Sequence, residues 1–311
     1  MAAGDRRLRP LRRLPGDPVT TAASRPRRSR SAPGFVAGYV ILLAAFGVVP
    51  TVYAIYYAFT DSGGAFAGLS NFAVAAADFR FLPSIGHVAL YLVCWLAALV
   101  VFVVGLALLL HRLGARGVGR ALRLLYYLPG ALAGAASVLV WLFVLDPAVS
   151  PVGFLLRAVG YQTFGQVIAP GNLPVLFAMI AFWTGAGGWI VVMYGALNTI
   201  SPEVLEAARI DGAGAWQTAR RIQIPLLRKW IVYMVILAFA GGTQLFVEPQ
   251  LLSQASVGVA GRDYSPNQLS YDFAFQNDDV NTAAAISVEL LVVGLVVAAV
   301  FVVRSGFFDA D

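Results

Sequence analysis

The sequence holds few of the residues that build metal sites and disulfides. Its 311 residues include one cysteine, Cys94, and two histidines, His87 and His111. One cysteine allows neither an intrachain disulfide nor a cysteine-based metal site, and we expect Cys94 to be a small buried apolar side chain. The two histidines stand at opposite ends of one apolar run without companion ligands, so we expect no metal site and no cofactor in this chain.

Lysine is almost absent as well, which excludes one kind of nucleotide site. A phosphate-binding P-loop needs a lysine that follows a glycine-rich turn and precedes Ser or Thr. The one lysine, Lys229, follows Arg228 and precedes Trp230. We therefore expect that this chain does not hydrolyse ATP.

Charge is scarce throughout the chain. Charged residues make up 12% of the sequence and hydrophobic residues 59%, whereas soluble domains carry about one-quarter charged residues. Six apolar runs reach the roughly 20 residues that cross a bilayer. By residue number they are 35–59, 85–110, 121–145, 173–197, 230–252 and 283–303. The sequence predicts an all-α membrane protein with six transmembrane helices.

The cations lie mostly on one side of this predicted topology. A net charge of +6 and a pI near 9.7 would also fit a nucleic-acid partner. However, 19 of the 22 Lys and Arg residues lie in the N-terminal tail, in the connections after the second and fourth runs, or at the C-terminus. The three on the other side are Arg80, Arg157 and Arg262. Because cytoplasmic loops retain Lys and Arg, we predict cytoplasmic N- and C-termini and no nucleic-acid partner.

The first 33 residues form a basic tail ahead of the membrane domain at 34–311. Residues 1–33 are rich in Arg, Pro and Ser with few large apolar side chains, so we predict that they are disordered. We expect them to set the topology, and contact with anionic lipid headgroups is the alternative. The first apolar run is longer than the apolar core of a secretory signal, which has about 7–15 residues, so we expect this segment to stay uncleaved.

One polar stretch, residues 201–230, interrupts the apolar pattern. Ser201 suits a helix N-cap and Pro202 the first helical position, so a short helix is predicted to begin there. Gly212 and Gly214 follow, and either can adopt the left-handed conformation that ends a helix.

A second short helix is possible in this stretch, over residues 215–222, before Pro225 limits how it joins the next span. Small side chains at Ala207 and Ala208 in the first helix would let another molecule approach closely. That geometry suits a docking element. The alternative is a connector that packs only on its own helices.

The same stretch carries a pattern with fixed spacing. Its landmarks are Glu206, Ala207, Ala208, Gly212, Ile222, Ile224 and Pro225, with Asp211 and Ala213 on either side of the glycine. This pattern resembles the EAA loop of ABC importer permeases, most closely the carbohydrate-uptake branch that includes the maltose and glycerol-phosphate systems. It departs from the family at Ile224 (usually Leu), Ala219 (often Phe) and Lys229 (often Pro). The resemblance covers residues 85–303.

The resemblance implies a type I ABC importer permease fold in the bacterial cytoplasmic membrane, with a core at 85–303 and a coupling loop at 198–229. The chain would not be an enzyme but would carry a sugar or sugar-like solute inward by alternating access. The implied partners are a second permease subunit in a heterodimer, two ATP-binding cassette subunits that bind ATP, an extracytoplasmic solute-binding protein and membrane lipid. The residues that the resemblance assigns to ATPase coupling are Glu206, Ala207, Ala208, Asp211 and Gly212.

Polar and aromatic side chains within the apolar runs are candidates for the solute path, because exposing an ionised group to lipid costs at least about 2.5 kcal/mol. They are Trp183, Gln244, Glu248 and Glu289. Gln244 and Glu248 lie four residues apart and are predicted to share one helical face. The alternatives are a packing role for Trp183, the outer interface for Glu248, and contact with the partner permease for Glu289.

Three other functions compete with this interpretation. A membrane-embedded enzyme would need paired histidines and carboxylates at membrane depth, and none are found. A secondary transporter would favour inverted repeats, which the span lengths do not indicate. A permease of the same superfamily for a polyamine, phosphate or an amino acid is the nearest alternative.

Overall fold

A computed structural model describes residues 32–114, 117–132, 134–256 and 258–305. The predicted disordered tail lies outside these residues, apart from positions 32 and 33. The regular elements of the described part are helical, and an isolated bridge pairs Thr60 with Phe66. The all-α class is therefore confirmed for the described residues.

The chain divides into two compact units, Met1–Val49 and Pro50–Asp311. In the first unit the described elements are α1 (Ala32–Leu43) and a π-helical turn, η1 (Ala44–Val48). Their large apolar side chains are exposed. A contiguous exposed apolar surface of this kind marks contact with a membrane or with another protein.

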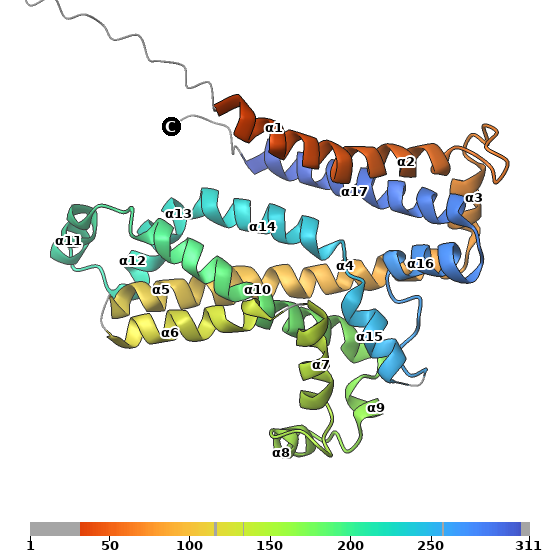
Figure 1. Cartoon of the computed structure of the whole chain (residues 1–311). Helices are drawn as coiled ribbons and strands as arrows, with labels where there is room; N and C mark the ends of the chain where they lie inside the picture. Colours follow the sequence, from red (N-terminus) through yellow and green to blue (C-terminus); the bar gives the residue numbers. More distant parts are fainter. Residues whose placement is uncertain (1–31, 115–116, 133, 257, 306–311) are drawn as a thin grey trace, which may run out of the picture. The chain divides into compact units, whose positions relative to one another are not determined.

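The remaining elements follow one another with short connections (Figure 1). The first of them are α2 (Val49–Ala58), α3 (Ser70–Ala77), α4 (Phe81–Ala98), η2 (Leu99–Val103), α5 (Val104–Leu113), α6 (Gly117–Tyr127), η3 (Leu128–Ala131), α7 (Gly134–Val144), α8 (Gly153–Ala158) and α9 (Phe164–Val167). The others are η4 (Pro170–Asn172), α10 (Leu173–Leu197), α11 (Pro202–Ile210), α12 (Ala215–Thr218), η5 (Ala219–Gln223), α13 (Ile224–Leu226), α14 (Arg228–Gly242), α15 (Val247–Ala255), α16 (Pro266–Gln276) and α17 (Val280–Ser305).

Four described helices are long and apolar enough to cross a membrane: Val36–Ala58, Phe81–Leu113, Pro170–Leu197 and Val280–Arg304. They correspond to the first, second, fourth and sixth predicted spans. Two bent helix pairs could serve as further spans, so the described residues provide four spans, or up to six if each bent pair crosses once.

The third predicted span is not one straight helix. Its two parts, Gly119–Ala131 and Gly134–Val144, meet at 103°. The first part ends in the 3₁₀ turn η3, which contains Pro129 and Gly130. Proline removes a backbone donor and glycine disfavours a continuing helix, so a bend at this dipeptide has a local cause.

The prediction of a fifth continuous span at 230–252 is wrong. Helix α14 ends at Gly242 and α15 begins only at Val247. Pro249, in the first turn of α15, has no N–H to donate to Leu245, so a helix that continued from α14 would lose a bond there. Within the first turn of a new helix the missing N–H costs nothing.

Helix α10 forms the centre of the second unit, beside α4, α5 and α6 (Figure 1). Its buried side chains include Phe177, Ile190 and Met193. A Cβ added at Gly187 would overlap the backbone of Tyr126, so glycine is needed for this close approach. The glycine-rich part of α10 therefore serves helix packing, as small residues do in membrane bundles.

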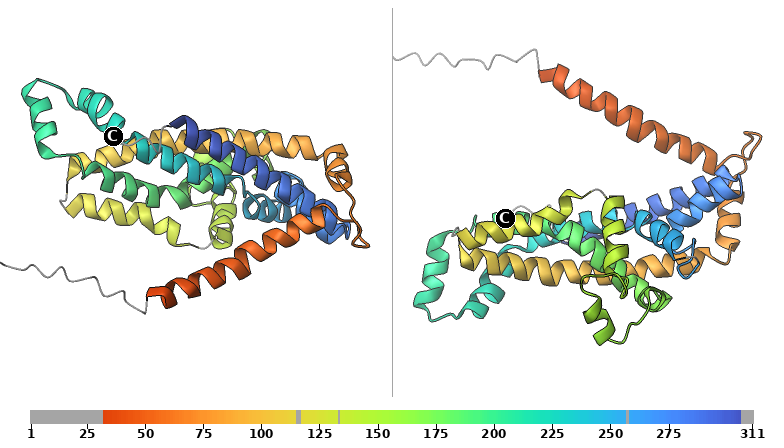
Figure 2. Two further views of the ribbon diagram at one scale, coloured as in Figure 1. Left: turned by 90° about the horizontal axis from the view of Figure 1, so that it is seen from above. Right: turned by 60° about the horizontal axis from the view of Figure 1, so that its bottom comes forward.

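The two ends of this unit differ in character. Helix α11 projects from one end in each view, beyond the ends of α5 and α10 (Figure 2). At the other end, the carbonyl of Thr60 accepts hydrogen bonds from the amides of Asn71 at 2.8 Å and Asn281 at 2.7 Å. These bonds fix the start of α17 to the loop that follows α2.

An ion-pair cluster strengthens the same end. The Arg80 guanidinium pairs with Asp78 at 2.9 Å and with Asp272 of α16 at 2.8 Å. Hydrogen bonds from Arg80 hold the pKa of Asp78 below its usual value. The cluster therefore joins the start of α4 to α16.

Candidate coupling loop and transport path

Between α10 and α14 the chain forms the predicted short helix, α11, at the projecting end (Figure 1). It begins at Pro202 with Ser201 as the N-cap residue, although the Ser201 side chain makes no capping hydrogen bond. Gly212 has φ of +78°, and its N–H donates to the Arg209 carbonyl at 3.0 Å. Gly214 has an ordinary φ of −67°. The helix is confirmed, and the left-handed turn that ends it belongs to Gly212.

Most of the predicted coupling residues face outward. Ala208 is buried, and the exposed ones are Glu206, Ala207, Asp211 and Gly212. Ile210 is 87% exposed and Trp216 is 71% exposed. A connector that packed only on its own helices would cover these large apolar side chains, so the arrangement leaves a surface for another molecule.

The second segment of the loop is longer than predicted. It runs as α12, η5 and α13 to Leu226, past the predicted end at Ile222. Five residues of π-helix, Ala219–Gln223, end two residues before Pro225. A proline clashes with the carbonyl four residues earlier, and the wider π-turn is a way to accommodate it without ending the helix.

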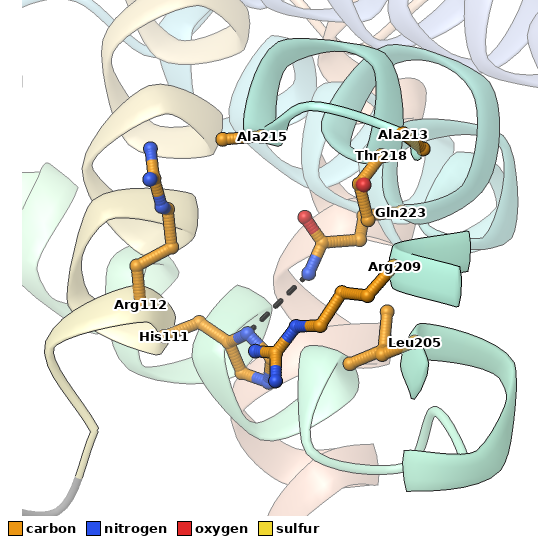
Figure 3. A pocket seen from close by; sticks show the side chains of 8 residues that line it. All are labelled: His111, Arg112, Leu205, Arg209, Ala213, Ala215, Thr218 and Gln223. Carbon is orange, nitrogen blue, oxygen red and sulfur yellow. Dashed lines mark hydrogen bonds between the residues drawn. The ribbon is translucent and has the colours of Figure 1, made fainter. Parts of the chain in front are cut away.

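A small basic pocket lies behind the loop (Figure 3). It has a volume of about 260 Å³, and its lining residues are His111, Arg112, Leu205, Arg209, Ala213, Ala215, Thr218 and Gln223. The buried Gln223 amide donates to Nδ1 of His111 at 3.4 Å. This bond links the end of α5 to the second segment of the loop. Sequence reasoning did not predict this pocket.

Of the predicted path residues, Gln244 lies in a shallow pocket of about 400 Å³ beyond the end of α14. The other lining residues are Phe246, Asn267, Ser270, Tyr271, Ala274 and Phe275. The Tyr271 ring lies 5.6 Å from the ring of Phe246 and 4.7 Å from that of Phe275. Exposed aromatic faces beside amides and hydroxyls can bind a polar solute that also carries apolar faces.

The expectation that Gln244 and Glu248 share one helical face is wrong. The helix breaks between them, so that Gln244 lies in the connection after α14 and Glu248 in the first turn of α15. Their spacing of four residues therefore does not align them.

Trp183 and Glu289 lie elsewhere. Trp183, on α10, lines a separate apolar cavity of about 780 Å³ and meets Trp141 edge-on at 5.8 Å. Glu289, on α17, has one buried carboxylate oxygen without a hydrogen-bond partner in the described part of the chain. The four predicted path residues thus do not meet in one site.

The histidines make separate contacts. His87 stacks on Tyr264 at 4.8 Å, and His111 meets Tyr194 edge-on at 6.3 Å. Among the described residues, no three His, Cys, Asp or Glu side chains come close enough together to hold a metal ion.

The pocket residues Asn267, Ser270 and Tyr271 were missed from the sequence, although a signal for their helix is present. They lie on α16, which Ser265 caps reciprocally with Gln268. A Ser followed three residues later by Gln is the pattern of a capping box.

Comparison with known proteins places this arrangement in a family. Residues 102–308 match the family of the binding-protein-dependent transport system inner membrane component. A multiple sugar-binding transport system permease, MsmF of Streptococcus mutans, is 27% identical over 265 residues, or 83% of this chain and 89% of the relative. AmyD of Thermoanaerobacterium thermosulfurigenes, a probable starch degradation products transport permease, is 24% identical over 87% of this chain and 92% of its own length.

A solved structure has the same fold. A chain from the crystal structure of a bacterial ABC transporter involved in the import of the acidic polysaccharide alginate aligns with a TM-score of 0.76. The alignment covers 89% of this chain and 96% of that chain, at 19% identity. The family match covers more than half of the chain, and this protein therefore belongs to the family of binding-protein-dependent transport system inner membrane components, the multi-pass permeases of ABC importers.

Proposed function

We propose that this chain moves a sugar or sugar-like solute into the cytoplasm as the permease subunit of an ABC importer. The observation that carries the proposal is α11, whose exposed Glu206–Ala207 face is followed by the left-handed turn at Gly212. The names of MsmF and AmyD refer to sugars and starch products. They favour a sugar over a polyamine, phosphate or an amino acid.

The expected assembly contains a second permease subunit, in a heterodimer, and two ATP-binding cassette subunits that bind ATP. An extracytoplasmic binding protein would deliver the solute. The family description supports this last partner, as does the similar alginate importer, which was solved in complex with a periplasmic protein that carries an alginate pentasaccharide.

The proposed coupling follows from how α11 joins the bundle. Ala207 would let an ATPase subunit approach closely, Glu206 would accept its hydrogen bonds, and Ile210 would be covered on docking. The helical run Ala215–Leu226 then meets α14 at 65°. Leu227, at the joint, is 1% exposed. A packed joint of this kind transmits a displacement of α11 to α14 instead of absorbing it.

The proposed solute path passes the pocket at Gln244, because α14 leads directly to it. Sugars present apolar ring faces and hydroxyl groups, which suit Tyr271 and the amides of Gln244 and Asn267. A motion of α14 would change the shape of this pocket. In this proposal Glu289 contacts the partner permease, which would give its unpaired oxygen a hydrogen bond.

The proposed topology puts both termini and the coupling loop in the cytoplasm, and α16 outside. Single cysteines at two exposed positions, Gly214→Cys and Arg262→Cys, test it in a Cys94→Ser background. They should react with impermeant reagents from opposite sides of the membrane. Reaction from the same side would contradict the topology.

The function is tested through the solute-binding protein that the proposed importer requires. Its thermal stability is measured with a panel of mono- and oligosaccharides, spermidine, phosphate and amino acids, and the ligand that stabilises it is then followed in ATP-dependent uptake by the reconstituted importer. We expect a saccharide. Stabilisation and uptake only with a polyamine, phosphate or an amino acid would refute the sugar assignment.

A further inference from the structure

The basic pocket behind the coupling loop contains more positive charge than its surroundings balance. Arg112 reaches it from the end of α5 and Arg209 from the end of α11, while no Asp or Glu of the described segments lines it (Figure 3). Among the described residues, neither guanidinium forms an ion pair with a carboxylate. Both side chains are exposed, and two cations around one opening raise the local concentration of anions there.

A third cation adds to this field from behind. The Arg123 guanidinium lies 4.5 Å over the ring of Tyr194, and that ring makes a T-shaped contact with His111. Nη1 of Arg123 is buried and has no hydrogen-bond partner among the described residues. The wall of the pocket formed by His111 therefore has a further cation behind it, which is partly buried.

The donors suit an anion with several oxygens. Arginine presents fixed pairs of N–H groups that match phosphate in a bidentate manner. With Nδ1 of His111 accepting from the Gln223 amide, Nε2 of the imidazole would carry the proton and could donate to an anion. The cavity of about 260 Å³ has room for one phosphate group and a few waters.

We propose that this pocket binds a phosphate group, supplied either by a free phosphate or phosphate ester or by the headgroup of an acidic phospholipid. Arg112 lies next to the last residue of the candidate span Phe81–Leu113, and cations at the ends of spans can contact acidic headgroups. The site faces the cytoplasm in the proposed topology, and its existence does not depend on which solute is carried.

A bound phosphate would add a direct link between α5 and α11. It would link Arg112 on a membrane span to Arg209 on the coupling helix, and so restrict the movement of α11 relative to α5. Occupancy of the pocket would then regulate coupling without any contact with the transported solute.

The test uses the full-length chain, purified in neutral detergent or placed in phosphatidylcholine nanodiscs. One arm measures binding of radiolabelled inorganic phosphate by equilibrium dialysis. The other arm adds phosphatidylglycerol to the nanodiscs and counts retained lipid by native mass spectrometry. Saturable binding of one phosphate per chain would identify a free anion, and selective retention of phosphatidylglycerol would identify a headgroup. Either result supports the proposal.

The variants assign the binding to the pocket. Arg112→Gln with Arg209→Gln should weaken binding about tenfold or more, because the charge-assisted hydrogen bonds are lost. Arg220→Gln changes an exposed arginine of the same loop that does not line the pocket and should bind like the wild type. If the double variant fails to fold by circular dichroism, each single variant should still show weakened binding.

Two results would overturn the proposal: no saturable binding of either probe, or equal binding by the wild type and the pocket variants. Both can be separated from failure of the proposed function, because sugar uptake by the wild-type importer is measured independently of phosphate binding.

Discussion

Replacing Gly212 should uncouple transport by a route that can be worked out from the backbone alone. Gly212 has φ of +78°, and a Cβ built there meets no atom within 4 Å. Within this chain, any effect of Gly212→Ala must therefore come from backbone strain and not from a clash. The left-handed region costs an L-residue about 1–2 kcal/mol, and a β-branched residue such as Val fits it less well still.

That strain acts on the turn that orients α11. A penalty of this size reduces the population of the required geometry by roughly five- to thirtyfold. The native turn includes the hydrogen bond from the Gly212 N–H to Arg209 and another from Ala213 to Ala208 at 2.9 Å. We expect α11 to lose its orientation while the membrane helices stay folded, because the change lies at the projecting end of the bundle.

Gly214 provides a matched control two residues away. Its φ of −67° suits any residue, and a Cβ there would meet only Gln217, at 3.9 Å. In reconstituted importers, ATP-dependent uptake should fall strongly for Gly212→Ala and further for Gly212→Val, while Gly214→Ala keeps wild-type uptake. Equal uptake by Gly212→Ala and Gly214→Ala would refute the reasoning.

Three further predictions concern the bundle and its other end. Gly187→Ala should lower the thermal stability by several degrees in detergent, because its Cβ would overlap the Tyr126 backbone, whereas Gly188→Ala has open space and should be neutral; equal melting temperatures would contradict the packing. Tyr271→Ala and Gln244→Ala should each raise the KM for sugar uptake without loss of the assembled importer, and unchanged kinetics in both would remove the pocket from the path. The lowered pKa of Asp78 contributes stability that is present above the usual carboxyl pKa of about 4 and is lost as the pH falls further. The Asp78→Asn variant should therefore be less stable than the wild type at neutral pH, and its stability should vary less as the pH falls. Melting temperatures between about pH 3 and 7 test this, and parallel curves for the two proteins would exclude the linkage.

The parts that the sequence predicted correctly depend on local signals. The position of α11 could be inferred because Ser201 and Pro202 mark a helix start and Gly212 can end one, all within a dozen residues. Run length likewise identified the four long apolar helices, since the bilayer thickness sets the length of a span.

The structure differs from the predictions where contacts join residues that are distant in sequence, or where a proline interrupts an apolar run. The break after α14 follows Gly242, where a Cβ would overlap Leu92 of α4, and only the fold brings these residues together. Pro249 was visible in the sequence, and it could have indicated that Gln244 and Glu248 lie on different helices.

Neither pocket could have been predicted from a pattern. The basic pocket combines Arg112 with Arg209, and the pocket at Gln244 includes Tyr271, in each case from helices that are separated in sequence. No spacing rule connects such pairs, because their proximity results from how α5, α11, α14 and α16 are arranged in the bundle.

The most direct test of the account concerns the face that α11 would present to an ATPase subunit. Ala207→Trp adds bulk at an exposed small residue, and Ala207→Ser is the control that keeps the residue small. The measurement is the amount of ATPase subunit that copurifies with membrane-inserted permease, taken with ATP-dependent uptake by the same preparations. We expect Ala207→Trp to lose ATPase association and uptake, and Ala207→Ser to retain both. Full ATPase association and uptake by Ala207→Trp would show that the loop is only a connector, and would contradict the proposal that α11 docks on an ATPase subunit.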